Sequence, residues 1–397
     1  MTNTASRPLV LLRRLFIASI INMAMGVIYV WSIFLLPLEA ELQVERAALS
    51  LIPALALVGF TIGMVVHDQL LRYFGKIGFA ILAFGLAAGG HMLYAQVPSY
   101  WGLLIGYGIC FGFGSGLGYG LALALATGTE SRTRPLAVGI TMASFALSGI
   151  VLPTLFGPLI AGAPTATSFS VISLAMVCAS VLVVFVLFLS PDIRSDVSIR
   201  SGALPRQTFP IYSTSFFYLA IIFFLISCVG LLIVSQISGI LTSNGLPRRS
   251  VDFGPSLFTI GYLLGSLFGG NVVQLLGGRW SLALSGLVAG LGLLGLSTGI
   301  IPLALGGAAL VGLTFGGSAS LMPVLIGEQF GADRIGAVYG RLMISYCFAG
   351  LLAPWLSGLL FSATGSYFAA MATGLTMCAL IIVLSYLLKD SRDVAQV

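Results

Sequence analysis

Long apolar stretches follow one another along almost the whole chain and are separated by short polar segments. A stretch of about 20 apolar residues spans a bilayer as a helix. Inside lipid a helix satisfies all of its own backbone hydrogen bonds, which favours helices for every one of these stretches. Breaks at Gly, Pro and charged residues predict twelve helices, at 13–38, 48–67, 74–95, 99–127, 135–161, 167–190, 211–242, 253–277, 280–299, 301–327, 335–363 and 366–388.

The second half of the chain repeats features of the first half at an offset of about 200 residues. Arg134 begins the fifth predicted helix and Arg334 precedes the eleventh, and each is followed by Ala and Val at the same spacing. The sequence FGFGS at 111–115 in the fourth helix matches FGGS at 315–318 in the tenth, at an offset of 203 to 204. Such internal repeats indicate that one structural unit occurs twice.

The repeat predicts an all-α integral membrane fold of two pseudo-symmetric six-helix bundles. Their expected ranges are 1–190 and 211–397, joined by a polar linker at 191–210. Six-helix repeats have the same orientation in the membrane, and folds of this kind bind substrate near the bilayer midplane at the repeat interface. We therefore expect transport by alternating access, in which the halves rock against each other.

Basic residues lie mostly on one side of this topology, and short loops rich in Lys and Arg stay cytoplasmic. Only Arg46, Arg248 and Arg249 lie on the other side. We therefore predict a multi-pass protein of the cell inner membrane with both termini in the cytoplasm. The net charge of +6 is then explained by anchors that meet anionic lipid, and no nucleic-acid partner is expected.

Composition supports the membrane assignment and argues against an enzyme. The chain is 58% hydrophobic and only 8% charged, which is far from the balance of a soluble domain. It has two histidines, no nucleotide-phosphate loop and no metal-type spacing of its five cysteines. We expect no catalytic residues, no metal and no cofactor, and we interpret the cysteines as small packing residues.

Several local segments resemble the major facilitator superfamily, and within it the oxalate/formate antiporter and monocarboxylate porter group. They are GVIYVWS at 26–32, GYG at 118–120, GLL at 230–232, GGS at 316–318, FG at 330–331 and YG at 339–340. The superfamily resemblance extends over nearly the whole chain. It implies a secondary active or facilitative transporter of a small organic solute, and it implies a monomer.

The resemblance also implies a substrate site. The porter group lines its cavity with an aromatic box, and the residues that fall at cavity positions here are Tyr29, Tyr119, Phe145, Gln236, Phe315 and Tyr346. The two cations with which the group holds a dicarboxylate are missing, because their positions fall near Ser266 or Leu267 and at Tyr346. Taken singly, each aromatic side chain has packing as its alternative role.

Arg341 is the one charge well inside a predicted helix, and a charge inside the membrane is a functional candidate. It lies about 10 Å beyond Arg334 along the helix, in the cytoplasmic half. It also lies roughly 140° around the helix from Tyr346, so the two side chains do not face the same point. Three roles stay open: contact with substrate, a gate ion pair with an acid such as Asp68, and simple anchoring at the interface.

Two functions therefore compete. The first is transport of a small carboxylate, most simply a monocarboxylate. The alternative is export of a neutral or amphipathic metabolite or drug, which the loss of both cations favours. No Asp or Glu lies at mid-membrane, so a dedicated proton relay on a carboxylate is not expected.

Overall fold

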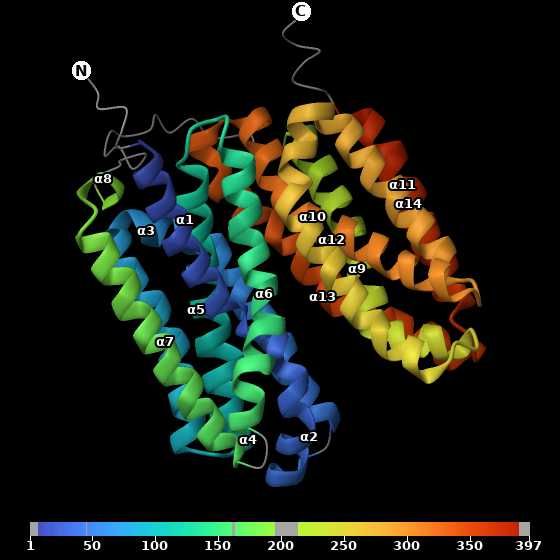
Figure 1. The fold of residues 1–397 in the computed structure, drawn as a ribbon, viewed down its shortest axis with the longest axis horizontal. Helices are drawn as coiled ribbons and strands as arrows, with labels where there is room; N and C mark the ends of the chain where they lie inside the picture. The colour runs from blue at the N-terminus through green and yellow to red at the C-terminus, as the bar shows by residue number, and fades with distance from the viewer. Residues whose placement is uncertain (1–6, 45, 161–162, 195–212, 389–397) are drawn as a thin grey trace, which may run out of the picture. The chain divides into compact units, whose positions relative to one another are not determined.

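The computed structural model describes residues 7–44, 46–160, 163–194 and 213–388, and this part of the chain is helical, without strands (Figure 1). Its helices are α1 (Arg7–Met25), η1 (Gly26–Val30), α2 (Trp31–Leu42), α3 (Arg46–Gln96), α4 (Tyr100–Leu103), η2 (Leu104–Phe111), α5 (Gly112–Thr127), α6 (Arg134–Ile160), α7 (Thr165–Phe188), α8 (Pro191–Arg194), α9 (Thr214–Ser243), α10 (Arg248–Leu276), α11 (Gly278–Leu296), α12 (Ile301–Phe330), η3 (Ala332–Arg334), α13 (Ile335–Thr364) and α14 (Phe368–Leu387).

The prediction of a multi-pass, all-helical membrane protein is confirmed. Within the described residues, 11 helices are long and apolar enough to cross a membrane. One of them, Leu51–Gln96, is 46 residues long and contains a break at Gly75, where φ is 65° and ψ is 169°. It therefore contains two predicted helices joined by a tight turn, which accounts for the twelfth span.

Two spans contain segments that are not α-helical. The first span changes from α1 to the 3-10 segment η1 and then to α2. The fourth span contains the π-helical segment η2 between α4 and α5. Such segments inside long helices are uncommon and often occur at hinges or functional sites.

The chain forms two compact units, and each is described by itself. Unit 1 comprises Met1–Glu130 and Ile140–Pro205, and unit 2 comprises Ser131–Gly139 and Arg206–Val397. Figure 1 shows α9 to α14 side by side as one bundle. Most of the predicted linker at 191–210 lies outside the described residues, so the predicted domain boundaries stay a prediction.

Close backbone contact between two helices organises unit 1. Gly112 and Gly116 of α5 lie against the backbone of α3 at Ala56 and Phe60, where a β-carbon on either glycine would overlap a carbonyl oxygen. Small residues allow this approach in lipid, where apolar association gives no driving force between helices.

Unit 2 repeats the same contact. Gly312 and Gly316 of α12 lie against the backbone of α10 at Phe258 and Tyr262. The equivalent glycines are therefore 200 residues apart, so the predicted match of 111–115 with 315–318 has the wrong register. That match followed local identity in a Gly-rich segment, whereas the helix contacts define which positions correspond.

The π-helical segment η2 explains why the offset between equivalent residues of the two units changes by one along the fourth span. In unit 1, α3 contacts Gly108 and Phe113, which are five residues apart, whereas in unit 2 α10 contacts Ala309 and Leu313, which are four apart. A π-turn closes over five residues and an α-turn over four. The segment η2 therefore accommodates one extra residue in the first copy.

The turns after the second and eighth spans also correspond. Gly75 (φ 65°, ψ 169°) and Gly277 (φ 82°, ψ 166°) adopt the same conformation, which side chains other than glycine rarely allow. The residues that follow bind helix ends: Lys76 Nζ donates to the carbonyl of Ile193 at 2.5 Å, and Arg279 Nη2 donates to that of Leu388 at 3.2 Å. In both units, therefore, a cation just after the turn binds a backbone carbonyl of a distant segment.

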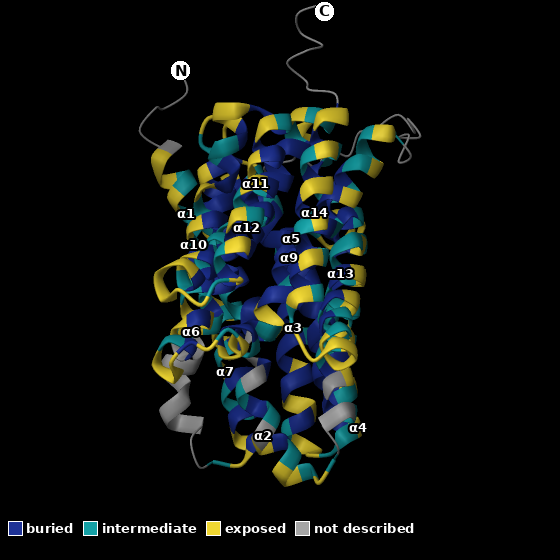
Figure 2. Ribbon diagram, turned by 90° about the vertical axis from the view of Figure 1, so that its right-hand side faces the viewer, coloured by how far each residue is buried: buried dark blue, intermediate teal, exposed yellow. Residues whose placement is uncertain are grey.

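The helices bury one side and expose apolar side chains on the other. Buried and exposed positions alternate along single helices such as α11 and α14 (Figure 2). Exposed apolar side chains include Leu287 at 52% and Leu291 at 53%, both on α11. Exposed apolar surface of this extent is characteristic of helices that face lipid.

Candidate substrate-binding residues

An aromatic cluster lies inside unit 1 on three different helices. The Tyr119 ring of α5 meets the Phe145 ring of α6 at 5.0 Å between centroids and 90°, and it meets the Phe60 ring of α3 at 5.4 Å and 72°. Phe60 and Phe145 are 6.0 Å apart. Edge-to-face pairs of this kind contribute about 0.5–1.5 kcal/mol each beyond burial. Two predicted site residues, Tyr119 and Phe145, are thus brought together.

Contacts between α1 and α6 hold Phe145 in place. Gly26 approaches the Phe145 carbonyl so closely that a β-carbon would overlap it. One turn away, Asn22 Nδ2 donates to the Thr141 carbonyl at 2.7 Å, and both of these side chains are fully buried. A buried amide between two helices fixes their relative position, because losing it would leave polar groups unpaired in an apolar interior.

A second aromatic cluster lies inside unit 2. Phe315 of α12 stacks on Tyr346 of α13 at 6.4 Å and 11°, and Tyr346 stacks on Phe223 of α9 at 6.2 Å and 25°. Tyr262 of α10 meets Phe315 edge-on at 5.3 Å and 67°. Gly230 of α9 provides the space for the Phe315 ring, since a β-carbon there would overlap it. Phe315 and Tyr346, both predicted, therefore share one cluster.

Gln236 belongs to a different group of contacts. Its Oε1 accepts a hydrogen bond of 3.1 Å from the Tyr367 hydroxyl, and the Tyr367 ring stacks on Phe361 at 4.4 Å. Desolvation raises the pKa of Tyr367, so its hydroxyl remains a donor. Among the described contacts, Gln236 is tied to the end of α13 and the start of α14, not to the Phe315 cluster.

The two predicted charges have local partners. Arg341 Nη1 donates to the Ala337 carbonyl at 2.8 Å, one turn earlier on α13. Asp68 pairs with Arg72 at 2.7 Å, one turn later on α3, and both side chains are partly exposed. Neither contact involves the aromatic clusters. The remaining residue predicted at the substrate site, Tyr29, lies in η1, and its side chain is outside the described part of the structure.

Three cluster members were missed by the sequence: Phe60 in unit 1, and Tyr262 and Phe223 in unit 2. The repeat could have found two of them, because Phe60 and Tyr262 occupy equivalent positions against Gly116 and Gly316. Phe223 has no such signal, since the helix that carries it is apolar on every side.

His91 has the contacts of a structural residue. It is fully buried, its Nδ1 lies 2.8 Å from the Ala87 carbonyl, and its ring packs on Tyr107, Phe111 and Phe169. No group of three His, Cys, Asp or Glu side chains within the described residues is arranged to hold a metal ion.

Comparison with known proteins identifies the fold. The family model of the Major Facilitator Superfamily matches residues 218–396, and no curated protein sequence matches the chain. A structure of the Escherichia coli fucose:proton symporter FucP is similar with a TM-score of 0.65 and 14% identity, covering 94% of this chain and 98% of that one. The fold is the major facilitator fold.

A second major facilitator structure is similar over an even larger share of this chain. The proton:xylose symporter XylE, bound to 6-bromo-6-deoxy-D-glucose, gives a TM-score of 0.75 and 12% identity, covering 97% of each chain. Identities this low establish the fold and leave the substrate open. The resemblance to the oxalate/formate and monocarboxylate group stays a prediction.

Proposed function

We propose that this protein is a secondary active or facilitative transporter that moves a small organic solute by alternating access. The observation that carries the proposal is an aromatic cluster in each unit of a major facilitator fold: Tyr119 and Phe145 in one, and Phe315 and Tyr346 in the other. Apolar walls with a few polar groups are typical of small-molecule sites. Transport by this fold also agrees with the match to the superfamily's family model.

A small carboxylate is the proposed substrate class. Tyrosine hydroxyls donate hydrogen bonds to a carboxylate, and the positive edges of aromatic rings attract its charge. Tyr119 and Tyr346 would supply these donors. Arg341 lies on the same helix as Tyr346, but its guanidinium is bonded to the backbone at Ala337, so we do not assign it to the carboxylate. A monocarboxylate carries one negative charge, so it needs fewer basic side chains than the dicarboxylate that the oxalate/formate antiporter group binds.

Transport of a neutral or amphipathic solute is the second candidate. It is favoured by the composition of the clusters, whose described ring contacts involve only Phe and Tyr side chains. The structurally similar FucP and XylE are sugar:proton symporters by their names, so neutral sugars belong in the substrate panel.

Uptake into proteoliposomes tests both candidates. The purified protein is reconstituted, and counterflow of radiolabelled monocarboxylates, dicarboxylates and neutral sugars is compared with protein-free liposomes. We expect saturable exchange of monocarboxylates that unlabelled monocarboxylate competes away. Exchange of neutral solutes alone would replace the carboxylate assignment by the second candidate. If no solute in the panel shows exchange or protects the protein from thermal unfolding, the transport proposal fails.

A further inference from the structure

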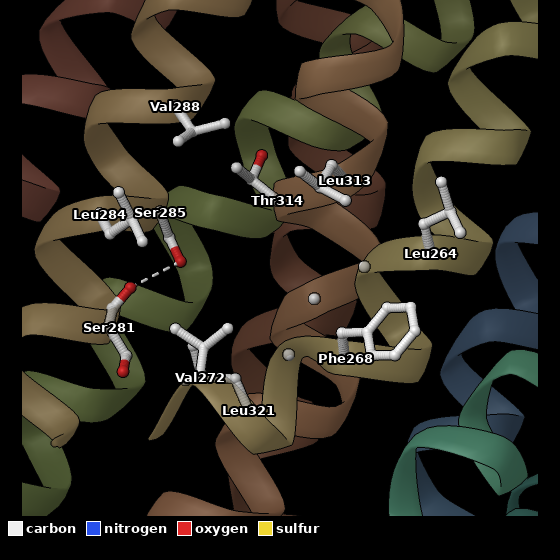
Figure 3. Close-up of a pocket in the computed structure, with 13 residues that line it drawn as sticks. Leu264, Phe268, Val272, Ser281, Leu284, Ser285, Val288, Leu313, Thr314 and Leu321 are labelled. Atoms are coloured by element: carbon white, nitrogen blue, oxygen red, sulfur yellow. Dashed lines mark hydrogen bonds between the residues drawn. The ribbon is translucent and has the colours of Figure 1, made fainter. Parts of the chain in front are cut away.

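A cavity of about 230 Å³ opens between α10, α11 and α12 of unit 2 (Figure 3). We call it the α10–α12 groove; its walls include Leu264, Phe268, Leu284, Val288, Gly317 and Leu321. At its rim Leu264, Phe268 and Leu284 are 48%, 50% and 39% exposed. All three helices are candidate membrane spans, so the mouth opens toward hydrocarbon.

At two positions of the groove the first unit carries larger side chains. The helix contacts align Leu117 of α5 with Gly317, and the two equivalent turn glycines align Phe79 of α3 with Ser281. Leu117 and Phe79 are both fully buried. The second copy thus has small residues at two groove positions where the first copy has large side chains.

The hydroxyl groups in the groove do not offer free donors. Ser281 Oγ donates to the Gly277 carbonyl at 2.7 Å, and Ser285 Oγ donates to the Ser281 carbonyl at 2.9 Å. Thr314 Oγ1 likewise donates to the Val311 carbonyl at 2.9 Å. A hydroxyl bonded to its own helix presents mainly its carbon atoms. The groove therefore has the chemistry of an apolar cavity.

We propose that the α10–α12 groove binds one acyl chain of a membrane phospholipid. Apolar cavities reject water, and one of about 150 Å³ takes up a hydrocarbon ligand as large as benzene. This groove is larger, and its rim faces the acyl chains of the bilayer, which are the hydrocarbon that surrounds a membrane span. A polar transport substrate would find no available donor in it, so the groove is separate from the proposed transport site.

Photolabelling from the bilayer tests the proposal. The full-length protein is reconstituted in liposomes that contain phosphatidylcholine with a diazirine in the middle of one acyl chain, and adducts are mapped by mass spectrometry. We expect Thr314 and Leu321, inside the groove, to be labelled more strongly than Leu291, which is exposed on α11 outside it. Labelling of Leu291 alone would show that the chain does not enter.

A filled groove provides the matched test. The β-carbon of Gly317→Leu has room, since its nearest neighbour is the Gly265 carbonyl oxygen at 3.7 Å. Excluding about two methylene groups predicts roughly a tenfold loss of labelling inside the groove. Gly306→Leu makes the same change on α12 where nothing lies within 4 Å, and should leave labelling unchanged. Equal labelling in both variants would overturn the proposal, and so would equal loss in both.

Discussion

Tyr346 offers a change that separates the two candidate substrates. Tyr346→Phe keeps the ring and removes only the hydroxyl, so the stacks on Phe315 and Phe223 remain. Tyr346→Ala removes both stacks, which at about 0.5–1.5 kcal/mol each amounts to roughly 1–3 kcal/mol of lost packing, before any cavity cost. The two variants therefore differ in stability for a reason that does not involve substrate.

If the Tyr346 hydroxyl binds a carboxylate, Tyr346→Phe should lose a hydrogen bond to a charged group, worth about 1.5–3 kcal/mol. That corresponds to roughly a ten- to a hundredfold weaker affinity. A neutral or amphipathic ligand held by the rings should instead lose little affinity in Tyr346→Phe and much more in Tyr346→Ala.

Equilibrium binding and thermal unfolding in detergent measure both effects. Tyr386→Phe is the matched control, because it removes the same hydroxyl from a half-exposed ring on α14, where its partner is Trp280 at 5.7 Å. Unchanged affinity for every solute in both Tyr346 variants would refute the placement of Tyr346 in the substrate site.

Three further outcomes are expected. Arg341→Gln should slow exchange in proteoliposomes with little change in affinity, because the guanidinium is bonded to its own helix at Ala337; a ten- to hundredfold loss of affinity would instead make it a substrate contact, by about 1.5–3 kcal/mol. In a cysteine-free background, Arg200→Cys should resist a membrane-impermeant thiol reagent added to right-side-out cells, whereas Arg248→Cys should react; the reverse result would invert the predicted topology. Gly265→Ala should lower the free energy of unfolding by about 1–3 kcal/mol, and with it the unfolding temperature, because its β-carbon would overlap the α12 backbone. Gly306→Ala should leave both unchanged, and equal stability of the two variants would contradict the helix contact.

The helices could be predicted from the sequence because a span needs only length and apolar composition. The repeat of the two halves could be predicted as well, since Arg134 begins α6 and Arg334 directly precedes α13. The predicted register of the fourth and tenth spans was wrong, because local identity in a Gly-rich segment gave an offset of 203 to 204 where the helix contacts give 200. The extra residue at η2 could not be predicted either, because it is visible only once both helix contacts are compared.

The aromatic clusters could be predicted only in part. The resemblance placed Tyr119, Phe145, Phe315 and Tyr346 at cavity positions, which stays a prediction, and it did not indicate that each pair shares a cluster within one unit. In a helix that is apolar all round, periodicity does not tell which face meets a neighbour. The partner of Gln236 was unpredictable for a similar reason, since Tyr367 lies 131 residues away in sequence.

The two units share a backbone plan, but one aromatic side chain of each cluster lies at a different level. In the register set by the helix contacts, Phe315 corresponds to Ser115 and not to Tyr119. Ser115 is fully buried and bonds the Met25 carbonyl of α1 at 2.9 Å, so its position has no room for a ring. In unit 2 the ring of Phe315 is accommodated by Gly230 instead. Tyr119 therefore lies four residues, or roughly 6 Å, from the level that symmetry with Phe315 would give. The glycines at the close helix contacts tolerate almost no substitution, whereas the position of a ring can change when one glycine on a neighbouring helix makes room for it. The fold therefore constrains the packing of the helices but allows each unit to present a different aromatic surface.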